Sequence, residues 1–588
     1  MLTVGAAPAD TAPSTARGRR GPHPLWLIGA AYLAGSLLLH RRVLPDLRTT
    51  VVGTGTTDHD VFIWWLHWVP WALLRGENPL LSDFQNHPDG VNALWNTAVP
   101  LLGVLLAPVT LTAGPVAAYN VGILLGPVVS GVALAAALGP YVPRWGPRAV
   151  AGALYAFSPF HLAHASVAHL NLVWSVLPPV LLYLVHVLFV RRLRRPVLTG
   201  ALVGVVLAAQ TVLYTQTLGL GVLMLVVTAA VLAVRFPARA RAGIPALVKA
   251  GLACLGSYLV LAAYPLYLIL AGPVRPRGQI RDPVYSAADL ANAVVPTRLT
   301  ALRPVPGGLA ERLQSHVGEQ GGYLGLAMLA LLVVAVVTGG TAVRLAAAVG
   351  AAAYVLSLGP TLVVLGQVTG VPLPWGPLTG VPLLAQAEPV RMQVFVTLAV
   401  AVLVALWLDR LPRLTGTAAP LAAGALTALA LLSWLPADAQ LTQPATTPAF
   451  FRAAPAHLAP DDVVETHPRL SGAWGGGAAP LRWQAVSGFA FRTTGGYFIG
   501  SDETHPVLVE SRWTPYQLGL RDLARGLPDP GSERAAAANR ALRATGTTVV
   551  LVVPPAAGDL VGVLDWTARV TGSPGERIED VWVFPVRG

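Results

Sequence analysis

The sequence predicts an all-α membrane domain of about eleven transmembrane helices, followed by a C-terminal α/β domain outside the membrane. Hydrophobic residues make up 54% of the 588 residues and charged residues only 12%, whereas soluble domains carry roughly 25% charged residues. Uncharged apolar segments recur along most of the chain, and about 20 such residues are enough to span a bilayer. After residue 436 this pattern stops, and shorter, more polar segments follow.

The elements follow in order along the chain. The first 23 residues are small, polar and Arg-containing, which predicts a disordered cytoplasmic tail. The membrane domain, residues 24–436, contains the apolar segments expected to be spans: 24–40, 115–138, 149–160, 171–190, 197–213, 217–234, 250–271, 322–338, 342–358, 391–408 and 417–436. Three longer polar segments are expected to be outer loops: 41–114, 272–321 and 359–390.

Two of these outer loops contain apolar pieces of their own. Amphipathic stretches at about 60–75 and 92–105 carry several Trp residues, which are typical of the headgroup layer, so both are predicted to lie at the membrane interface. The short apolar piece 361–368 lies in a segment rich in Pro and Gly, and it is predicted to re-enter the membrane without crossing it.

The Arg distribution predicts the orientation. With the N-terminus in the cytoplasm, the inner segments hold 16 basic residues and only two acids, Asp10 and Asp409. This asymmetry follows the positive-inside rule. It also explains the net charge of +12 better than nucleic-acid binding does, so no nucleic-acid partner is expected. An odd number of spans places the C-terminal domain outside the membrane.

Residues 437–588 are predicted to form an extracytoplasmic α/β domain. The stretches 461–465, 547–553 and 580–586 read as strands, and the Ala- and Arg-rich stretch 533–545 reads as a helix ended by Gly. Cys254 is the one cysteine of the sequence, which excludes an internal disulfide and a metal site built from cysteines.

Two closely spaced carboxylates, Asp58 and Asp60, follow the first predicted span. Between Asp89 and Asp282 the sequence contains no acid at all, so few carboxylates are available for chemistry at the membrane. We expect Asp58 to be a general base and Asp60 to assist, because partial desolvation at the membrane interface raises the proton affinity of a carboxylate. Their spacing also suits two oxygen ligands of Mg²⁺ or Mn²⁺, and a helix-capping Asp is a third interpretation.

Short motifs in the same region carry a resemblance to a known family. They are Thr57-Asp58-His59-Asp60, Glu77-Asn78-Pro79-Leu80, Asn86-His87-Pro88-Asp89-Gly90, Tyr155-Ala156-Phe157-Ser158-Pro159 with His169-Leu170-Asn171, and Glu388-Pro389-Val390-Arg391. With one span before a long outer loop, they make residues 20–440 resemble the GT-C membrane glycosyltransferases, such as the protein O-mannosyltransferases and similar bacterial enzymes. The resemblance implies inverting sugar transfer from a polyprenyl phosphate on the outer face, with the first-loop Asp as base or metal ligand.

Further residues are candidates for substrate binding. Arg391 opens a span at the outer face, where the positive-inside rule does not place a cation, and its planar guanidinium suits a donor phosphate. His169, Asn171, Glu319, Arg281 and Trp64 complete the expected set. The Arg residues of the 272–321 loop suit a phosphate too, but anchoring at lipid headgroups is the preferred interpretation for them. The i, i+3 pair His161 and His164 suits a metal ion on one helix face, but solvated interfacial histidines are the preferred interpretation.

The expected function is that of a glycosyltransferase in a bacterial plasma membrane. It would move a hexosyl or pentosyl group from a lipid-linked donor to a hydroxyl of an envelope glycan, lipid or protein, with membrane lipids as its surroundings. A transporter or flippase of lipid-linked saccharides is one alternative, although transporters place ionisable groups near the bilayer midplane and the predicted spans contain no acid in their interior. A non-catalytic envelope-assembly protein is the other.

Overall fold

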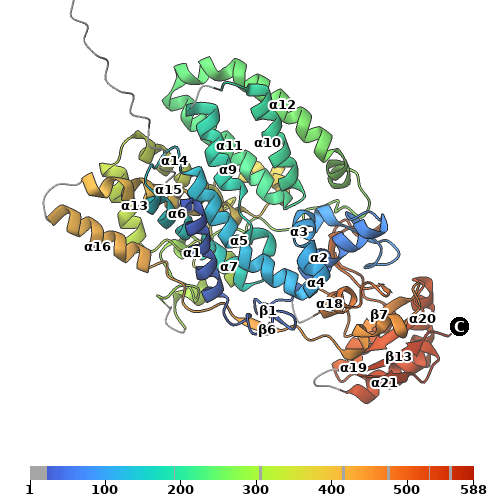
Figure 1. The fold of residues 1–588 in the computed structure, drawn as a ribbon. Helices are drawn as coiled ribbons and strands as arrows, with labels where there is room; N and C mark the ends of the chain where they lie inside the picture. Colours follow the sequence, from blue (N-terminus) through green and yellow to red (C-terminus); the bar gives the residue numbers. More distant parts are fainter. Residues whose placement is uncertain are drawn as a thin grey trace, which may run out of the picture.

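The computed structural model describes residues 23–190, 193–302, 307–413, 418–472, 477–528, 530–554 and 559–587. The predicted cytoplasmic tail, residues 1–23, lies outside this part of the chain except for its last residue. A bundle of helices forms the larger part of the molecule, and a smaller part with a β-sheet lies beside it at the C-terminal end (Figure 1).

Ten apolar helical segments make up the membrane part of the bundle as described. Five are long and apolar enough to cross a membrane: α5 (Pro115–Ala137), Leu170–Phe189, α11 (Thr215–Arg235), α12 (Pro237–Leu270) and Pro389–Arg410, which contains α15 (Gln393–Arg410). Five are shorter: α1 (Pro24–Leu39), α10 (Pro196–Thr211), α13 (Leu326–Thr338), α14 (Thr341–Ser357) and α16 (Ala418–Leu432). The chain is therefore built like a membrane protein, and the count of eleven spans stays a prediction.

Three predicted segments differ from the structure. The span at 149–160 is two short helices, α6 (Trp145–Ala156) and α7 (Pro159–Ser166), since Ser158 caps α7 and Pro159 cannot continue the hydrogen-bond ladder of α6. The segment 171–190 corresponds to the candidate span Leu170–Phe189, but it is divided into α8 (Leu170–Val173), α9 (Leu177–Val185) and the π-helical η2 (His186–Val190). The predicted re-entrant piece is wrong, because 361–368 belongs to the antiparallel hairpin of β4 (Thr361–Val364) and β5 (Gln367–Pro372).

Helix α2 (Asp58–Arg75) is the first-loop stretch that was expected at the membrane interface. Its indoles are buried instead: Trp64, Trp65 and Trp68 are at most 1% exposed. Phe489 packs edge-on against Trp64 at 5.3 Å between ring centroids, and Trp64 Nε1 donates a hydrogen bond to Gln484 Oε1 at 2.6 Å. The interfacial placement of these indoles is therefore wrong, because distant C-terminal residues cover them.

The C-terminal part contains a five-stranded sheet in the order β12-β13-β11-β7-β8. Its strands are β7 (Val463–His467), β8 (Arg492–Thr493), β11 (Val549–Val552), β12 (Glu576–Ile578) and β13 (Val581–Pro585). Strand β7 runs parallel to β11 and β8, whereas β13 is antiparallel to its neighbours. The accompanying helices are α17 (Ala449–Arg452), α18 (Ala479–Val486), α19 (Pro515–Ala524), α20 (Gly531–Ala544) and α21 (Leu560–Thr571).

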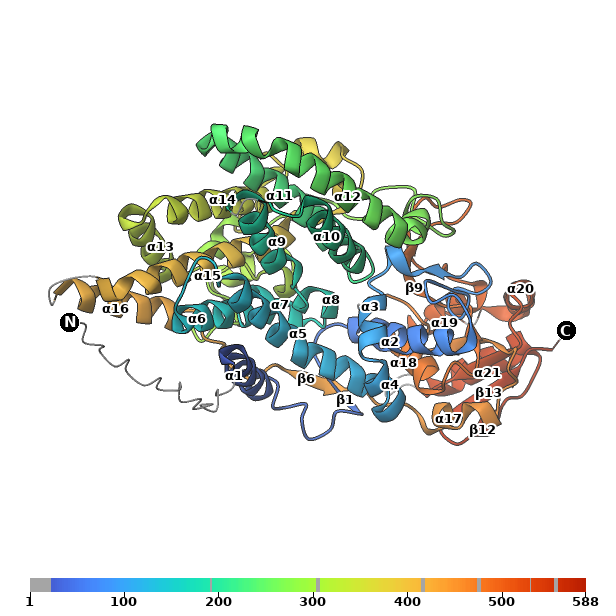
Figure 2. The same cartoon turned by 45° about the horizontal axis from the view of Figure 1, so that its top comes forward.

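The first loop and the C-terminal part are joined into one body. Two short strand pairs belong to it: β1 (Thr50–Val52) pairs with β6 (Thr442–Pro444), and β2 (Leu81–Ser82) pairs with β3 (Val91–Asn92). The short helices α3 (Pro100–Leu105) and α4 (Ala107–Ala113) also belong to it. The backbone of His87 donates to Thr493 O at 3.0 Å, and that of Thr493 donates to Phe84 O at 3.0 Å, so the loop continues the edge of the sheet at β8. Figure 2 shows α2 lying against α18 on this side.

Candidate functional site

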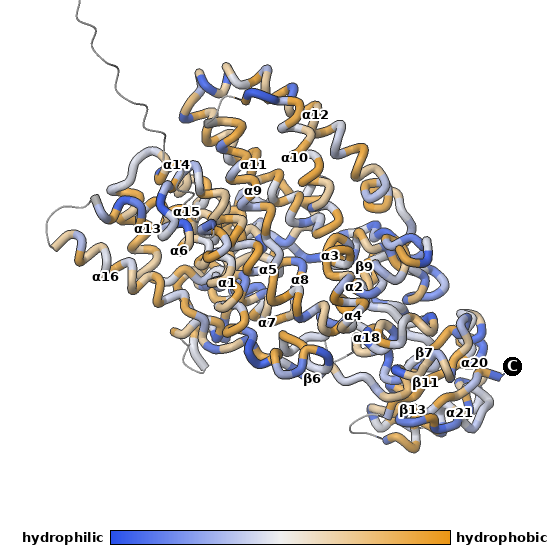
Figure 3. Tube along the Cα trace, viewed as in Figure 1, coloured by the Kyte–Doolittle hydropathy of each residue, from blue (hydrophilic) through white to orange (hydrophobic). Residues whose placement is uncertain are grey.

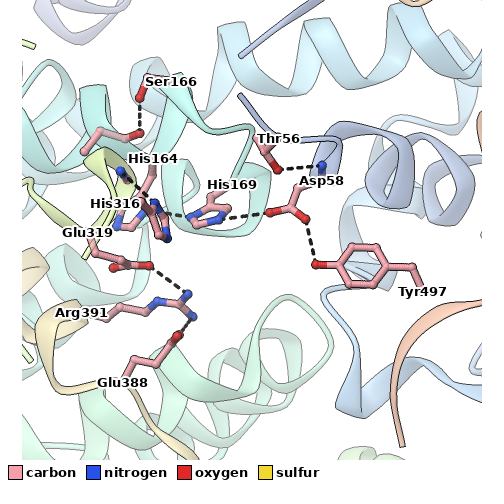
Figure 4. Close-up of polar contacts among 12 residues, drawn as sticks. Thr56, Asp58, His164, Ser166, His169, His316, Glu319, Glu388, Arg391 and Tyr497 are labelled. Carbon is pink, nitrogen blue, oxygen red and sulfur yellow. Dashed lines mark hydrogen bonds and ion pairs between the residues drawn. The ribbon is translucent and has the colours of Figure 1, made fainter. Parts of the chain in front are cut away.

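Asp58 begins α2 and lies where three parts of the chain meet. Its backbone N–H donates to Thr56 Oγ1 at 3.1 Å. Its side chain is 22% exposed and engages both oxygens: Oδ1 accepts a hydrogen bond from the Tyr497 hydroxyl at 3.0 Å, and Oδ2 lies 3.4 Å from His169 Nε2 (Figure 4). Tyr497 belongs to β9 (Tyr497–Gly500), which pairs with β10 (Leu508–Glu510) in the C-terminal part.

The environment of Asp58 favours the ionised carboxylate. Burial raises the pKa of this group, but the hydrogen bonds from His169 and Tyr497 oppose that effect, and the pKa lies below its usual value. The predicted rise in proton affinity is therefore wrong. Asp58 is an anion at neutral pH, able to accept hydrogen bonds or orient a partner.

Asp60, the other predicted catalytic and metal-binding residue, points elsewhere. Residues two apart on a helix of 3.6 residues per turn lie on nearly opposite sides. Asp60 is fully buried, forms an ion pair with Arg482 of α18, and lies 3.3 Å from His59 Nε2. The two carboxylates thus have different partners, and the structure does not bring them together around one ion.

Two histidines meet beside Asp58. Helix α7 ends at Ser166, and Ala168, at φ 67°, turns the chain back before α8. This turn brings His169 Nδ1 to 3.0 Å from His164 Nδ1. Burial lowers the pKa of His164 well below its usual value, so its ring is neutral. His161, the other residue of the expected i, i+3 pair, is buried and contacts Ser158 Oγ at 3.0 Å.

Glu319 completes a cluster with these histidines. It lies in the 3₁₀ helix η5 (Val317–Glu319), and its carboxylate and the ring nitrogens of His164 and His169 all lie within 4.8 Å of one another. Among the residues that the structure describes, this is the group of three found able to hold a metal ion. Burial raises the pKa of Glu319, but Arg391 and the neighbouring histidines together outweigh it and lower the pKa to about 2.

Arg391 lies in η8 (Pro389–Met392) at the start of the α15 span and faces this cluster. Its Nη2 donates to Glu319 Oε1 at 3.2 Å, and its Nη1 contacts the carboxylate of Glu388. Nη1 also donates to the Tyr214 hydroxyl and to Gln216 Oε1, at the beginning of α11. Sequence reasoning missed Tyr214 and Gln216, which carry no local motif.

The remaining predicted residues fall outside this centre. Arg281 is about half exposed and reaches Glu388 at 3.7 Å, so it lies at the rim. Asn171 is buried in α8, and its Oδ1 has no hydrogen-bond partner among the described residues. Trp64 is a packing residue between α2 and the C-terminal part. The structure therefore brings together Asp58, His169, Glu319 and Arg391, and it leaves Asp60 and Trp64 apart from them.

The chain was compared with known proteins. No protein-family model and no curated protein matches it. Among solved structures it is similar to the archaeal oligosaccharyltransferase AglB from Archaeoglobus fulgidus, in complex with an inhibitory peptide and a dolichol-phosphate, with a TM-score of 0.46, 10% identity, and 90% of this chain and 69% of that chain covered. It is also similar to the arabinofuranosyltransferase AftD from Mycobacteria, with a TM-score of 0.41, 17% identity, and 96% of this chain and 41% of that chain covered. Both are membrane glycosyltransferases of the GT-C superfamily.

Proposed function

We propose that this protein is a membrane glycosyltransferase that transfers a sugar from a polyprenyl-phosphate donor to a hydroxyl of an envelope glycan, lipid or protein. The observation that supports this most is the convergence of Asp58, His169, Glu319 and Arg391 from four separate segments of the chain. Gathering carboxylates, an imidazole and a guanidinium inside an apolar protein costs free energy, and such clusters mark functional sites. We place the site, and residues 437–588, on the outer face of a bacterial plasma membrane.

The proposed reaction is an inverting displacement. The acceptor hydroxyl oxygen forms a bond to the anomeric carbon while the bond from that carbon to the phosphate oxygen breaks. The hydroxyl proton passes to Asp58, and the lipid phosphate leaves with the bonding electron pair. Because the pKa of Asp58 lies below its usual value, proton transfer follows as the hydroxyl becomes acidic during bond formation.

Arg391 is proposed to receive the charge that develops on the phosphate. Its guanidinium is held by Glu319, Glu388, Tyr214 and Gln216, so it needs no reorganisation when the charge appears. Its Nε is buried and has no partner among the described residues, which leaves a donor for an oxygen atom of the substrate.

We further propose that His164, His169 and Glu319 hold a divalent cation, in place of the Asp58 and Asp60 pair expected from the sequence. The donor set fits: the His164 ring is neutral, and Glu319 Oε2 is buried without a hydrogen-bond partner in the described part of the chain. Asp58 beside His169 Nε2 has the arrangement of a carboxylate that orients a metal-binding imidazole. Two imidazoles with one carboxylate favour Mn²⁺ or Zn²⁺ over Mg²⁺, which prefers oxygen ligands. Such a cation would supply further positive charge near the leaving phosphate.

A donor panel tests the proposed function. The purified protein in lipid nanodiscs would be given polyprenyl-phosphate hexoses and pentoses, the matching nucleotide sugars, and an extract of envelope acceptors. We expect product from at least one lipid-phosphate donor and none from nucleotide sugars. For the variant Asp58→Asn, the matched control in this assay is Asp46→Asn. Asp46 is an exposed carboxylate of the same loop, and in the described contacts it bonds only with Arg48 and Thr49.

Two results would contradict the proposal. Product from nucleotide sugars alone would exclude a lipid-phosphate donor. Movement of an intact lipid-linked saccharide across the membrane, without cleavage of the sugar–phosphate bond, would favour the transporter alternative. Activity unchanged by removal of divalent cations would exclude only the proposed metal site.

A further inference from the structure

An apolar cavity of about 410 Å³ lies within the helical bundle. It is formed by α9, α11, α14 and α15, and its lining includes Leu181, Met224, Val231, Val349 and Phe395. This volume falls in the range of about 300–1,000 Å³ that is usual for ligand sites. None of the residues of the Asp58 cluster lines it, so the cavity is separate from the proposed active site.

A single charge marks one end of this cavity. Among the described residues that line the cavity, Arg239 is the one with a charged side chain. It lies at the beginning of α12 and is exposed. No carboxylate in the described chain lies within ion-pair distance of it, and the sequence from residue 90 to residue 281 contains no acid. Arg235, Arg241 and Lys249 lie nearby in the chain and are also exposed. Figure 3 shows hydrophilic residues at the turn between α11 and α12, above apolar helices.

The charged end lies far from the proposed active site. Helix α11 has 21 residues, which at 1.5 Å per residue span about 31 Å, close to the roughly 30 Å of a bilayer's hydrocarbon core. Gln216 of the Arg391 cluster is at its first turn, whereas Arg235 is at its last. A lipid with its phosphate at Arg391 therefore has its headgroup in the other leaflet from a lipid with its phosphate at Arg239.

We propose that this cavity binds one acyl chain of an anionic phospholipid, with the headgroup phosphate at Arg239, in the leaflet opposite the Asp58 cluster. The apolar lining matches the acyl chain. The Arg239 guanidinium, which has no carboxylate partner among the described residues, matches the anionic headgroup. Arg235 and Arg241 strengthen the local positive field without lining the cavity. This site goes beyond the transfer reaction, and its test does not depend on whether the protein transfers a sugar.

Native mass spectrometry measures this binding directly. The purified full-length protein would be exposed to equal amounts of phosphatidylglycerol and phosphatidylcholine with the same acyl chains. We expect about fivefold more bound phosphatidylglycerol, the effect of one Arg at an anionic lipid surface. Arg239→Gln should remove this preference, and Val231→Trp, which fills the cavity, should reduce binding of both lipids. Lys249→Gln is the matched control, because it removes a charge from the same helix outside the cavity lining.

Three results would overturn the proposal. Equal loss in Arg239→Gln and Lys249→Gln would mean a diffuse surface attraction. An unchanged lipid preference in Arg239→Gln would exclude the headgroup contact. Displacement of phosphatidylglycerol by an undecaprenyl phosphate at equal concentration would assign the cavity to the donor's own tail. Melting temperatures of all variants would show that each is folded.

Discussion

The buried ion pair between Asp60 and Arg482 gives a prediction that separates structure from chemistry. The pair joins α2 to α18, and the two side chains are 1% and 7% exposed. Arg482 Nη2 also donates to Thr446 O at 3.1 Å. Asp60→Asn removes one charge of the pair and leaves the Arg482 guanidinium buried without a counter-ion.

The size of the effect follows from that uncompensated charge. Removing one partner of a buried ion pair costs about 3–5 kcal/mol. Arg482 keeps its bond to Thr446 O, so we expect a loss near the lower end, about 3 kcal/mol, or roughly a 100-fold fall in the folded-to-unfolded ratio. Arg482→Gln should cost a similar amount. The double variant Asp60→Leu with Arg482→Met removes both charges and should recover most of the loss.

Differential scanning fluorimetry of the detergent-purified variants tests this. Both single variants should melt below the wild type, and the double variant should melt close to it. Sugar transfer by whatever fraction stays folded should persist in all three. Single variants that melt like the wild type but lose transfer would refute the reasoning, because Asp60 would then act in the chemistry.

Three further predictions concern single side chains. Arg391→Ala should raise the donor KM strongly and Arg391→Lys should restore it only in part, since the bidentate contact is lost; unchanged kinetics would remove Arg391 from the donor site. Tyr497→Phe removes the hydrogen bond to Asp58, which is worth about 1 kcal/mol, so kcat should fall about fivefold while the donor KM and the melting temperature stay unchanged. The control Tyr516→Phe changes a tyrosine of the C-terminal core and should leave kcat unchanged. Burial raises the pKa of Glu465 in β7 above its unfolded value. The stability of the wild type relative to Glu465→Gln should therefore fall as pH rises through that raised pKa. Melting temperatures of the two proteins that change in parallel with pH would contradict this.

Much of the fold could be predicted because it depends on local composition. The apolar runs at 197–213 and 217–234 match α10 and α11 within a few residues, and the strand prediction at 547–553 contains β11. Apolar length and β-branched content are properties of a short segment, so a single sequence contains them. The division at Pro159 was missed because α6 and α7 together have the apolar length of one span.

The site could be predicted only in part because it depends on residues far apart in the chain. Asp58 was chosen as a candidate from its position after the first span, but the sign of its pKa shift depends on His169 and Tyr497, which are distant in sequence. Helical spacing pointed to His161 as the partner of His164, whereas the left-handed turn at Ala168 supplies His169. The burial of Trp64 likewise depends on α18, because an indole suits a headgroup layer and a protein core equally well.

The most direct measurement for the account is the rate of sugar transfer by Asp58→Asn, with the same lipid-phosphate donor and acceptor as the wild type. The change keeps the size of the side chain and removes its charge. Because the side chain is partly exposed, the melting temperature should stay close to that of the wild type. The loss of a general base should lower kcat by about 10²–10⁴-fold. Full transfer activity in correctly folded Asp58→Asn protein would contradict the central claim.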